Sequence, residues 1–320
     1  MTAKKLRIVI PGGSGQVGSL LARHFHAQGH GVTILTRRPK PAPWREIAWD
    51  GQTIGDWARA LEGSNICINL AGRSVNCRYN QANRKEIYDS RILPTRLLSQ
   101  AIASLAQPPQ LWMNASTATI YRHSLSKPKD EATGELGGGE PGAPDTWNFS
   151  IRVAKDWEQT FFSTALPHTR KIALRSAVTF SADAGGIFDV LSTLVRRGLG
   201  GKNGSGSQMV SWVHGEDFVR AVEFLIADES LSGVVNIASP NPLPNREFMR
   251  ALRKAWGTPI GLPSPKWLIE IGCFLMQTES ELVLKSRCVV PGRLDQAGFQ
   301  FRFLDWPEAA INLVQQWRRK

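Results

Sequence analysis

The stretch Pro11-Gly12-Gly13-Ser14-Gly15-Gln16-Val17-Gly18 has the spacing G-x-x-G-x-x-G and joins an apolar run at residues 6–10 to a helical pattern at residues 16–28. Such a turn needs glycines because the chain reverses sharply, the backbone approaches a ligand closely and the helix packs tightly on the strand. The helix amino terminus also offers unpaired N–H groups to phosphates. A plain tight turn has the same spacing, but the strand–turn–helix context favours a dinucleotide site. The residues expected to hold a pyrophosphate there are Gly12, Ser14, Gly15, Gln16, Val17 and Gly18.

The segments that follow alternate short apolar runs with amphipathic ones, which is typical of βαβ units in a parallel sheet. The pattern predicts a six-stranded, doubly wound α/β sheet, a Rossmann-type dinucleotide-binding domain over residues 1–176. Residues 122–146 are rich in Gly, Pro, Lys and Asp and are expected to form a mobile loop. Strands are predicted at residues 6–10, 32–35, 47–49, 66–70, 111–116 and 171–175, and helices at 16–28, 84–106 and 148–165.

Beyond residue 176 the pattern becomes less regular. Strands at residues 209–213 and 234–237 alternate with helices, and a last helix is expected at residues 307–317. We predict that residues 177–320 form a smaller lobe on the substrate side of the sheet, with contacts that interleave with the first domain.

The second predicted strand ends in Thr36-Arg37-Arg38. A site for NAD usually has an acidic residue at this place, which accepts hydrogen bonds from the ribose 2′-hydroxyl. A guanidinium pairs instead with a 2′-phosphate. Two arginines are also common on a solvated surface, but the missing acid and the paired cations agree. We therefore predict that Thr36, Arg37 and Arg38 bind the 2′-phosphate of NADP(H).

The composition argues against several other classes of protein. Of the 320 residues, 42% are hydrophobic and 21% are charged, which is typical of a soluble protein with a sizeable core. No apolar run approaches the roughly 20 residues of a membrane span, and residues 1–5 do not resemble a signal peptide. We therefore predict a cytoplasmic protein without a membrane partner.

The cysteines and the charged residues argue against a metal site and a nucleic-acid partner. The four cysteines have no metal-ligand spacing, so we predict reduced thiols and no metal site. The net charge of +12 is spread along the chain rather than gathered in a stripe with stacking aromatics. This charge favours an anionic cofactor or substrate, and we predict no nucleic-acid partner.

Two further motifs follow predicted strands: Asn69-Leu70-Ala71-Gly72 and Ser116-Thr117-Ala118-Thr119-Ile120-Tyr121. With the glycine turn, they resemble an extended short-chain dehydrogenase/reductase of the sugar-nucleotide epimerase type. The chain is more narrowly similar to atypical epimerase family proteins that carry a C-terminal domain of unknown function. That similarity rests on Lys85-x-Ile87-x-x-Ser90-Arg91, Ser211-Trp212-Val213-His214 and Ala297-Gly298-Phe299-x-Phe301, among other motifs along almost the whole chain.

The resemblance implies a Rossmann-type fold and NADP(H) binding. It implies that Leu70, Ala71 and Gly72 line the adenosine side and that Arg91 reaches the cofactor or orders the loop beside it. It further implies that Val178 lies near the nicotinamide. The chain departs from the resemblance at the catalytic pair.

Extended dehydrogenases use Tyr-x-x-x-Lys, in which the tyrosinate exchanges the proton and the lysine lowers its pKa. None of the three tyrosines here has a lysine four residues later, and Phe149 and Val153 stand at the nearest equivalent positions. The usual mechanism is therefore absent or rerouted. Thr117 lies four residues before Tyr121, where the family places the hydroxyl that polarises a substrate carbonyl; a capped strand end is the competing interpretation.

Tyr121 is the second catalytic candidate, as a proton donor. Phe149, Trp212 and His214 are the candidates for the substrate pocket, although aromatic residues at such spacings also fill cores. Two functions fit these residues. One is an NADP(H)-dependent oxidoreductase or epimerase, acting as a monomer or homodimer on a small carbonyl or hydroxyl substrate. The other is an NADPH-binding sensor with little or no turnover.

Overall fold

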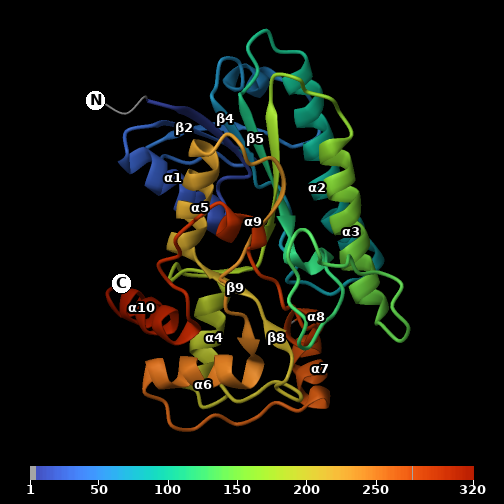
Figure 1. Cartoon of the computed structure of the whole chain (residues 1–320), viewed down its shortest axis with the longest axis vertical. Helices are drawn as coiled ribbons and strands as arrows, with labels where there is room; N and C mark the ends of the chain where they lie inside the picture. The colour runs from blue at the N-terminus through green and yellow to red at the C-terminus, as the bar shows by residue number, and fades with distance from the viewer. Residues whose placement is uncertain (1–4, 276) are drawn as a thin grey trace.

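The computed structural model describes residues 5–275 and 277–320 (Figure 1). Its largest sheet has seven parallel strands in the order β10-β6-β5-β4-β1-β2-β3. The order runs outward from β1 in both directions, which confirms the predicted doubly wound α/β fold. The strands are β1 (Arg7–Pro11), β2 (Gly31–Thr36), β3 (Arg45–Ala48), β4 (Ile66–Asn69), β5 (Leu111–Thr117), β6 (Arg170–Ser176) and β10 (Gly233–Ile237).

The sheet has one strand more than the sequence pattern predicted, so the six-stranded prediction was wrong. β10 pairs with β6 from Gly233 opposite Ile172 to Ile237 opposite Ser176. A short apolar run looks the same in a central sheet and in a separate lobe, so the pattern could not name its partner. Residues 177–320 therefore contribute to the sheet as well as to the lobe.

Helices cover both faces of the sheet (Figure 1). On one face α1 (Gln16–Ala27) packs against α5 (Gly215–Ala227), and on the other α2 (Gln81–Ala103) packs against α3 (Asp145–Phe162). Successive side chains of a strand point to opposite faces. In β1, Ile8 and Ile10 accordingly join the core beneath α1 and α5, and Val9 joins the core beneath α2.

The lobe lies at the lower end of Figure 1, beyond the carboxyl ends of the sheet strands. Its core forms where α6 (Asn245–Trp256) packs against α4 (Ile187–Arg196) and α10 (Trp306–Arg318). The parallel pair β7 (Val178–Phe180) and β9 (Trp212–His214) joins this core to the sheet. The remaining short elements are η1 (Asp56–Ala60), η2 (Ala118–Ile120), β8 (Met209–Val210), β11 (Leu243–Pro244), α7 (Lys266–Leu275), α8 (Glu281–Leu284) and α9 (Gly292–Gln296).

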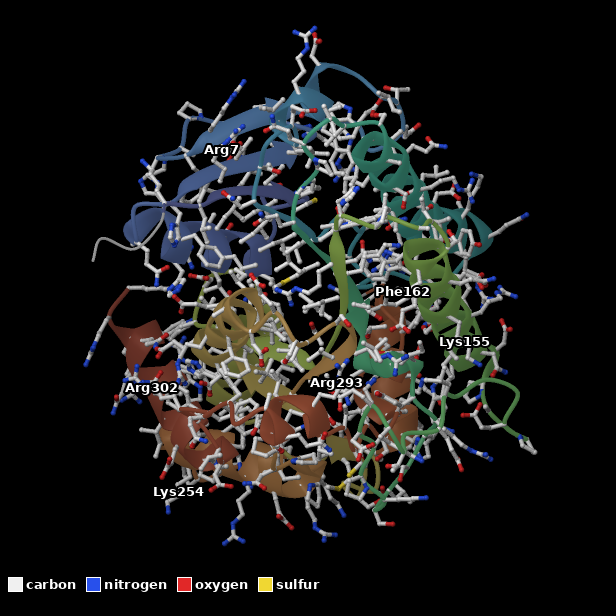
Figure 2. The ribbon with its side chains drawn as sticks, turned by 45° about the horizontal axis from the view of Figure 1, so that its top comes forward. Arg7, Lys155, Phe162, Lys254, Arg293 and Arg302 are labelled. Carbon is white, nitrogen blue, oxygen red and sulfur yellow. The ribbon has the colours of Figure 1, made fainter. Side chains whose placement is uncertain are left out.

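The C-terminal segment is tied to the sheet and to the loop at residues 122–146. Arg293 of α9, labelled in Figure 2, donates to the carbonyl oxygen of Val234 at 2.9 Å. In the loop, Lys129 donates its N–H to the Cys288 carbonyl at 2.7 Å and accepts from Val290 N–H at 3.0 Å. The loop is therefore held by residues more than 150 positions away in the sequence.

Among the described residues, no helix has both the length and the apolar character needed to span a membrane.

Candidate functional site

The glycine turn has the steric features of a phosphate cradle. Gly12 has φ +73°, and a Cβ there would lie 2.6 Å from the Ala71 nitrogen. A Cβ on Gly18 would lie 2.4 Å from the Gly13 Cα, so the helix packs closely on the turn. A Cβ on Gly15 would lie 3.8 Å from its nearest neighbour, the Gly12 carbonyl oxygen, and no side chain caps α1 at Gly15. The amino terminus of α1 is therefore left with N–H groups that no side chain caps, which suits a pyrophosphate.

The end of β2 offers two free cations beside this cradle. Thr36 is buried and donates its hydroxyl hydrogen to the Ser14 hydroxyl oxygen at 3.1 Å. Arg37 and Arg38 are exposed, and neither side chain has a hydrogen bond or ion pair with another described residue. Both guanidinium groups are therefore available to an external anion such as a 2′-phosphate.

A buried amide network shapes the end of β4. The Asn69 side chain donates to the Asn114 side-chain oxygen at 2.6 Å and accepts from the Ala71 N–H at 3.1 Å. This second bond fixes the turn at residues 70–72 next to Gly12. The motif Asn69-Leu70-Ala71-Gly72 thus has a structural reason, because the Asn69 side chain holds the backbone two residues further on.

Arg91 orders the same loop from α2. Its guanidinium donates to the carbonyl oxygens of Ile87 at 2.9 Å and Arg73 at 3.0 Å. It also lies 5.3 Å from the Trp157 ring centroid, within range of a cation–π interaction. Burial lowers the pKa of Arg91 to about 10. The resemblance implied that Arg91 reaches the cofactor or orders the loop beside it, and the structure shows the contact with the loop.

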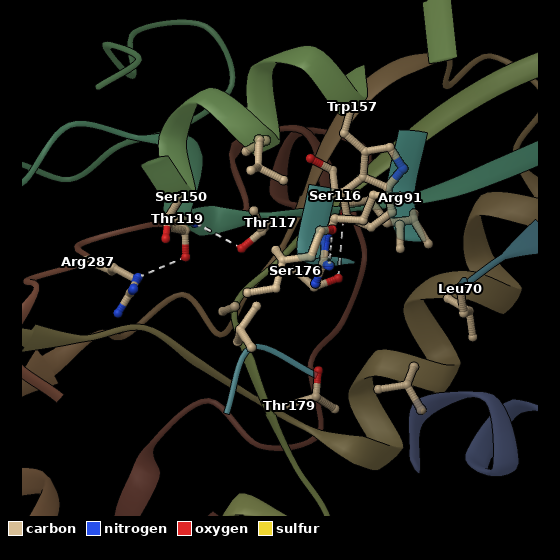
Figure 3. A pocket seen from close by; sticks show the side chains of 18 of the residues that line it. Leu70, Arg91, Ser116, Thr117, Thr119, Ser150, Trp157, Ser176, Thr179 and Arg287 are labelled. Carbon is tan, nitrogen blue, oxygen red and sulfur yellow. Dashed lines mark hydrogen bonds between the residues drawn. The ribbon is translucent and has the colours of Figure 1, made fainter. Parts of the chain in front are cut away.

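A cavity of about 460 Å³ opens next to the glycine turn, at the carboxyl ends of β5 and β6 (Figure 3). Of the predicted site residues, it is lined by Gln16, Val17, Leu70, Arg91 and Thr117. Val178 does not line it, whereas its neighbours Ala177 and Thr179 do. The position of the cavity at the switch point of a doubly wound sheet is the usual place for a ligand.

Thr117 ends β5 and faces the cavity (Figure 3). Its hydroxyl oxygen accepts a hydrogen bond from the Thr119 N–H at 3.1 Å, which caps η2. The hydroxyl hydrogen remains available to a substrate oxygen. Thr117 is thus both the cap that the competing interpretation foresaw and a donor aimed at the cavity.

Tyr121 does not lie in the cavity, which corrects its interpretation as a proton donor. It is buried, and its hydroxyl donates to the Asn236 side-chain oxygen at 2.9 Å and accepts from Arg175 at 2.9 Å. Burial raises the pKa of Tyr121. Because η2 turns the chain after Thr117, the Tyr121 side chain faces the core between β6 and β10.

The three predicted pocket residues also pack elsewhere. Trp212 is fully buried, with its ring 5.2 Å from the ring of Trp306 in the lobe core. His214 caps α5 by accepting from the Glu216 N–H at 3.1 Å, and burial lowers its pKa. Phe149 is buried behind the cavity wall, in edge contact with Tyr79. These positions correct the prediction, because each aromatic ring is needed to fill a core.

The face of α3 that lines the cavity consists of Ser150, Val153, Ala154 and Trp157. It contains no tyrosine or lysine, in agreement with the missing Tyr-x-x-x-Lys pair. Polar side chains reach the cavity instead from segments that the sequence analysis did not single out. These side chains are Tyr79, Glu281 and Arg287.

Two known protein families match parts of this chain. The NAD dependent epimerase/dehydratase family matches residues 8–148, and a domain of unknown function, DUF1731, matches residues 264–313. The epimerase family protein SDR39U1 of Bos taurus is 31% identical over 304 residues, covering 93% of this chain and 96% of the relative. This chain belongs to the epimerase family. The epimerase family protein Mb2239 of Mycobacterium bovis is 33% identical over 92% of this chain and 93% of its own.

Solved structures agree with the family assignment. Human epimerase family protein SDR39U1, crystallised with NADPH, is 28% identical, has a TM-score of 0.85 and covers 97% of this chain and 99% of its own. UDP-N-acetylglucosamine 4-epimerase from Bacillus cereus, with 18% identity and a TM-score of 0.74 over 98% of this chain and 100% of its own, shares the fold. Membership of the epimerase family thus confirms the resemblance that the motifs carried.

Proposed function

We propose that this chain is an NADP(H)-dependent oxidoreductase or epimerase that acts on a small carbonyl or hydroxyl compound without a Tyr-x-x-x-Lys pair. The proposal rests on the position of the phosphate cradle next to the cavity that contains Thr117. The phosphate cradle at the glycine turn leads into a cavity where the hydroxyl of Thr117 has a free hydrogen. The NADPH bound by human SDR39U1 supports the same choice of cofactor.

The preference for NADP(H) over NAD(H) rests on the end of β2. Arg37 and Arg38 are exposed beside the cradle, with no acidic partner among the described residues. A 2′-phosphate would pair with these guanidinium groups, whereas a 2′-hydroxyl would leave them unused. Thr36 and Ser14, hydrogen-bonded to each other, hold the adjacent backbone in place.

When bound, the nicotinamide would donate or accept the hydride. Thr117 would hold the substrate oxygen by donating its hydroxyl hydrogen, which places the carbonyl carbon at the carboxyl end of β5. The apolar side chains of Val153, Ala154 and Trp157 would exclude water from one wall. The proton on the substrate oxygen would exchange through another polar group of the cavity, because Tyr121 lies outside it.

The second candidate function is an NADPH-binding sensor or partner-binding protein with little turnover. The specific observation in its favour is the apolar character of the α3 face, which holds neither tyrosine nor lysine. A cavity with a built polar wall opposite that face favours the enzyme, and we place the enzyme first for this reason.

Calorimetric titration of the whole chain with NADPH and with NADH tests the cofactor proposal. We expect NADPH to bind more tightly, and the doubly substituted Arg37→Ala and Arg38→Ala protein to lose about 10- to 100-fold in NADPH affinity with little change for NADH. The control is Arg59→Ala, an exposed arginine of η1 near the amino ends of β1 and β2, whereas Arg37 and Arg38 follow the carboxyl end of β2. Equal affinity of the wild type for both cofactors would refute the role of the two arginines.

Turnover is tested separately, by following NADPH consumption against a panel of carbonyl compounds. Consumption with any of them supports the enzyme. Because an epimerase regenerates its cofactor, hydroxyl compounds are also incubated with the NADP⁺-bound protein and their configuration is followed. NADPH binding with neither consumption nor a change of configuration would favour the sensor.

A further inference from the structure

The wall of the cavity opposite Leu70 is formed by the C-terminal segment at residues 281–287, which lies in the domain of unknown function. Glu281 and Arg287 line the cavity, and Lys285 lies directly behind Thr119. Figure 3 shows Arg287 pointing toward Thr119, at the end of the cavity away from Leu70. The segment therefore lies at the end of the cavity away from Leu70, which is expected to meet the adenosine half of a cofactor.

This wall holds more positive than negative charge. Lys285 and Arg287 are two cations, with side chains 0% and 12% exposed. Among the described residues, Glu281, with its side chain 1% exposed, is the only carboxylate within ion-pair distance of them. The Glu281 Oε1 atom is 3.7 Å from Lys285 Nζ and 3.8 Å from Arg287 Nη2, too far for hydrogen bonds. One buried positive charge is thus left without a counter-ion, which is unfavourable unless an anion joins it.

The guanidinium of Arg287 is also short of acceptors. It has five N–H donors. Its Nε donates to the Thr119 hydroxyl oxygen at 3.2 Å, and its Nη1 approaches the Lys285 carbonyl oxygen at 3.5 Å. Its Nη2 has no hydrogen bond to any described residue. The outer edge of the guanidinium therefore presents free donors to the cavity.

Neighbouring groups show the effect of this excess charge. Burial, and then the charge of Arg287, lower the pKa of Lys285 to about 8. Burial, followed by the charge of Lys285, also lowers the pKa of His123. Glu140 is the other acid near Lys285, and its charge raises the pKa of Lys285. Its carboxylate accepts from the Gly138 N–H at 2.7 Å, and no ion pair joins it to Lys285 among the described residues.

We propose that Arg287 and the Thr119 hydroxyl form a binding site for the carboxylate of the substrate, which is a small oxo or hydroxy acid. The inference rests on the proposed function, because it places the reacting carbonyl at Thr117. Thr117 and Thr119 are two residues apart on one turn, so the carboxylate and the carbonyl lie within a few bonds of each other. A carboxylate carries a single negative charge and matches the fork of a guanidinium. It balances the cation of this wall that Glu281 leaves unpaired.

Matched acids and esters test the proposal by binding alone. Pyruvate, acetoacetate and levulinate place the carboxylate at increasing distance from the carbonyl, and their methyl esters lack the charge. Each is titrated by calorimetry into the whole 320-residue chain saturated with NADP⁺. We expect at least one acid to bind about tenfold or more tightly than its ester, and Arg287→Gln to weaken that acid about 10- to 100-fold. Arg122→Gln, an exposed arginine that does not line the cavity, is the control.

The outcomes separate this proposal from the proposed function. NADPH affinity, measured in the same series, is expected to be unchanged in Arg287→Gln; if the wild type fails to bind NADPH, the proposed function fails. Arg287→Lys keeps the charge and loses the fork, so we expect an intermediate affinity for the acid even if the glutamine variant folds poorly. No binding of any acid, equal binding of acid and ester, or tighter binding of UDP than of every acid would overturn the carboxylate site.

Discussion

Replacing Glu158 by glutamine tests whether the buried ion pair beneath the cavity holds α3 to the sheet. Arg175 of β6 donates to both carboxylate oxygens of Glu158, at 2.8 and 2.7 Å, and both residues are less than 10% exposed. Ser116 donates to the same carboxylate at 2.5 Å. Burial opposes the charge of Arg175, but the bonds and the charge of Glu158 outweigh it and raise its pKa.

The substitution leaves the guanidinium buried against a neutral amide. Removing one partner of a buried pair costs about 3–5 kcal/mol, because the other charge is left uncompensated. We expect a loss of unfolding free energy near the lower end of this range. The glutamine oxygen still accepts one hydrogen bond, and Arg175 still donates to the Tyr121 hydroxyl at 2.9 Å. About 3 kcal/mol is a large fraction of the 5–15 kcal/mol that stabilises a typical domain.

Chemical denaturation of four proteins measures this value: the wild type, Glu158→Gln, Arg175→Met and the double variant. The double variant is expected to be less destabilised than the sum of the two single ones, because it removes both charges. Lys155→Gln, on the exposed side of α3, is the control and should change stability by less than about 0.5 kcal/mol. A loss below about 1 kcal/mol in Glu158→Gln, or strict additivity, would show that the pair does not anchor α3.

Four further outcomes follow from the structure. Gly18→Ala places its Cβ against Gly13 and should lower stability by about 1–3 kcal/mol in thermal melts, with weaker NADPH binding by calorimetry. Thr117→Val should lower kcat about 100-fold on any substrate found, with Thr117→Ser restoring most of it and NADPH affinity unchanged. Trp212→Ala should cost about 3–5 kcal/mol on denaturation and leave NADPH affinity unchanged, as expected for a core residue. The pKa of Lys285 is about 8 in the folded protein and about 10.4 in an unfolded chain, so the unfolded chain binds more protons between these values. The unfolding free energy of the wild type should therefore rise relative to Lys285→Met from pH 8 to pH 10, and a flat or falling difference would contradict the lowered pKa.

The glycine turn and the alternation of strands and helices were predictable because their causes are local. Gly12 and Gly18 meet steric limits set by residues next to them in the turn and at the end of β4. The apolar runs of the central strands are continuous because both of their faces are covered. The same holds for Thr117, whose place at the end of β5 follows from where the strand stops.

The roles of the other site residues could not be predicted, because they depend on contacts with residues far away in the sequence. Tyr121 has the right residue type for an acid, but Asn236 and Arg175 hold its hydroxyl inside the core. Trp212 needed the position of α10 to be recognised as a core residue. Arg287 belongs to no motif, and only its approach to Thr119, across 168 positions, gives it a place in the cavity.

The two ends of the cavity are held by different parts of the chain. The glycine turn and β2, which are expected to meet the cofactor, belong to the central sheet. The C-terminal segment at residues 281–287, which forms the charged wall of the cavity, is held by the loop at residues 122–146. There His123 accepts from the Ser286 N–H at 3.1 Å, and the Lys129 backbone makes hydrogen bonds with Cys288 and Val290. Because these contacts do not involve the glycine turn, substitutions in the proposed carboxylate site are expected to leave the cofactor contacts intact. The chain lacks the Tyr-x-x-x-Lys pair on α3, but polar groups still surround the carboxyl end of β5. Thr117 and Thr119 come from the end of β5 itself, and the C-terminal segment adds the charged groups of Glu281 and Arg287.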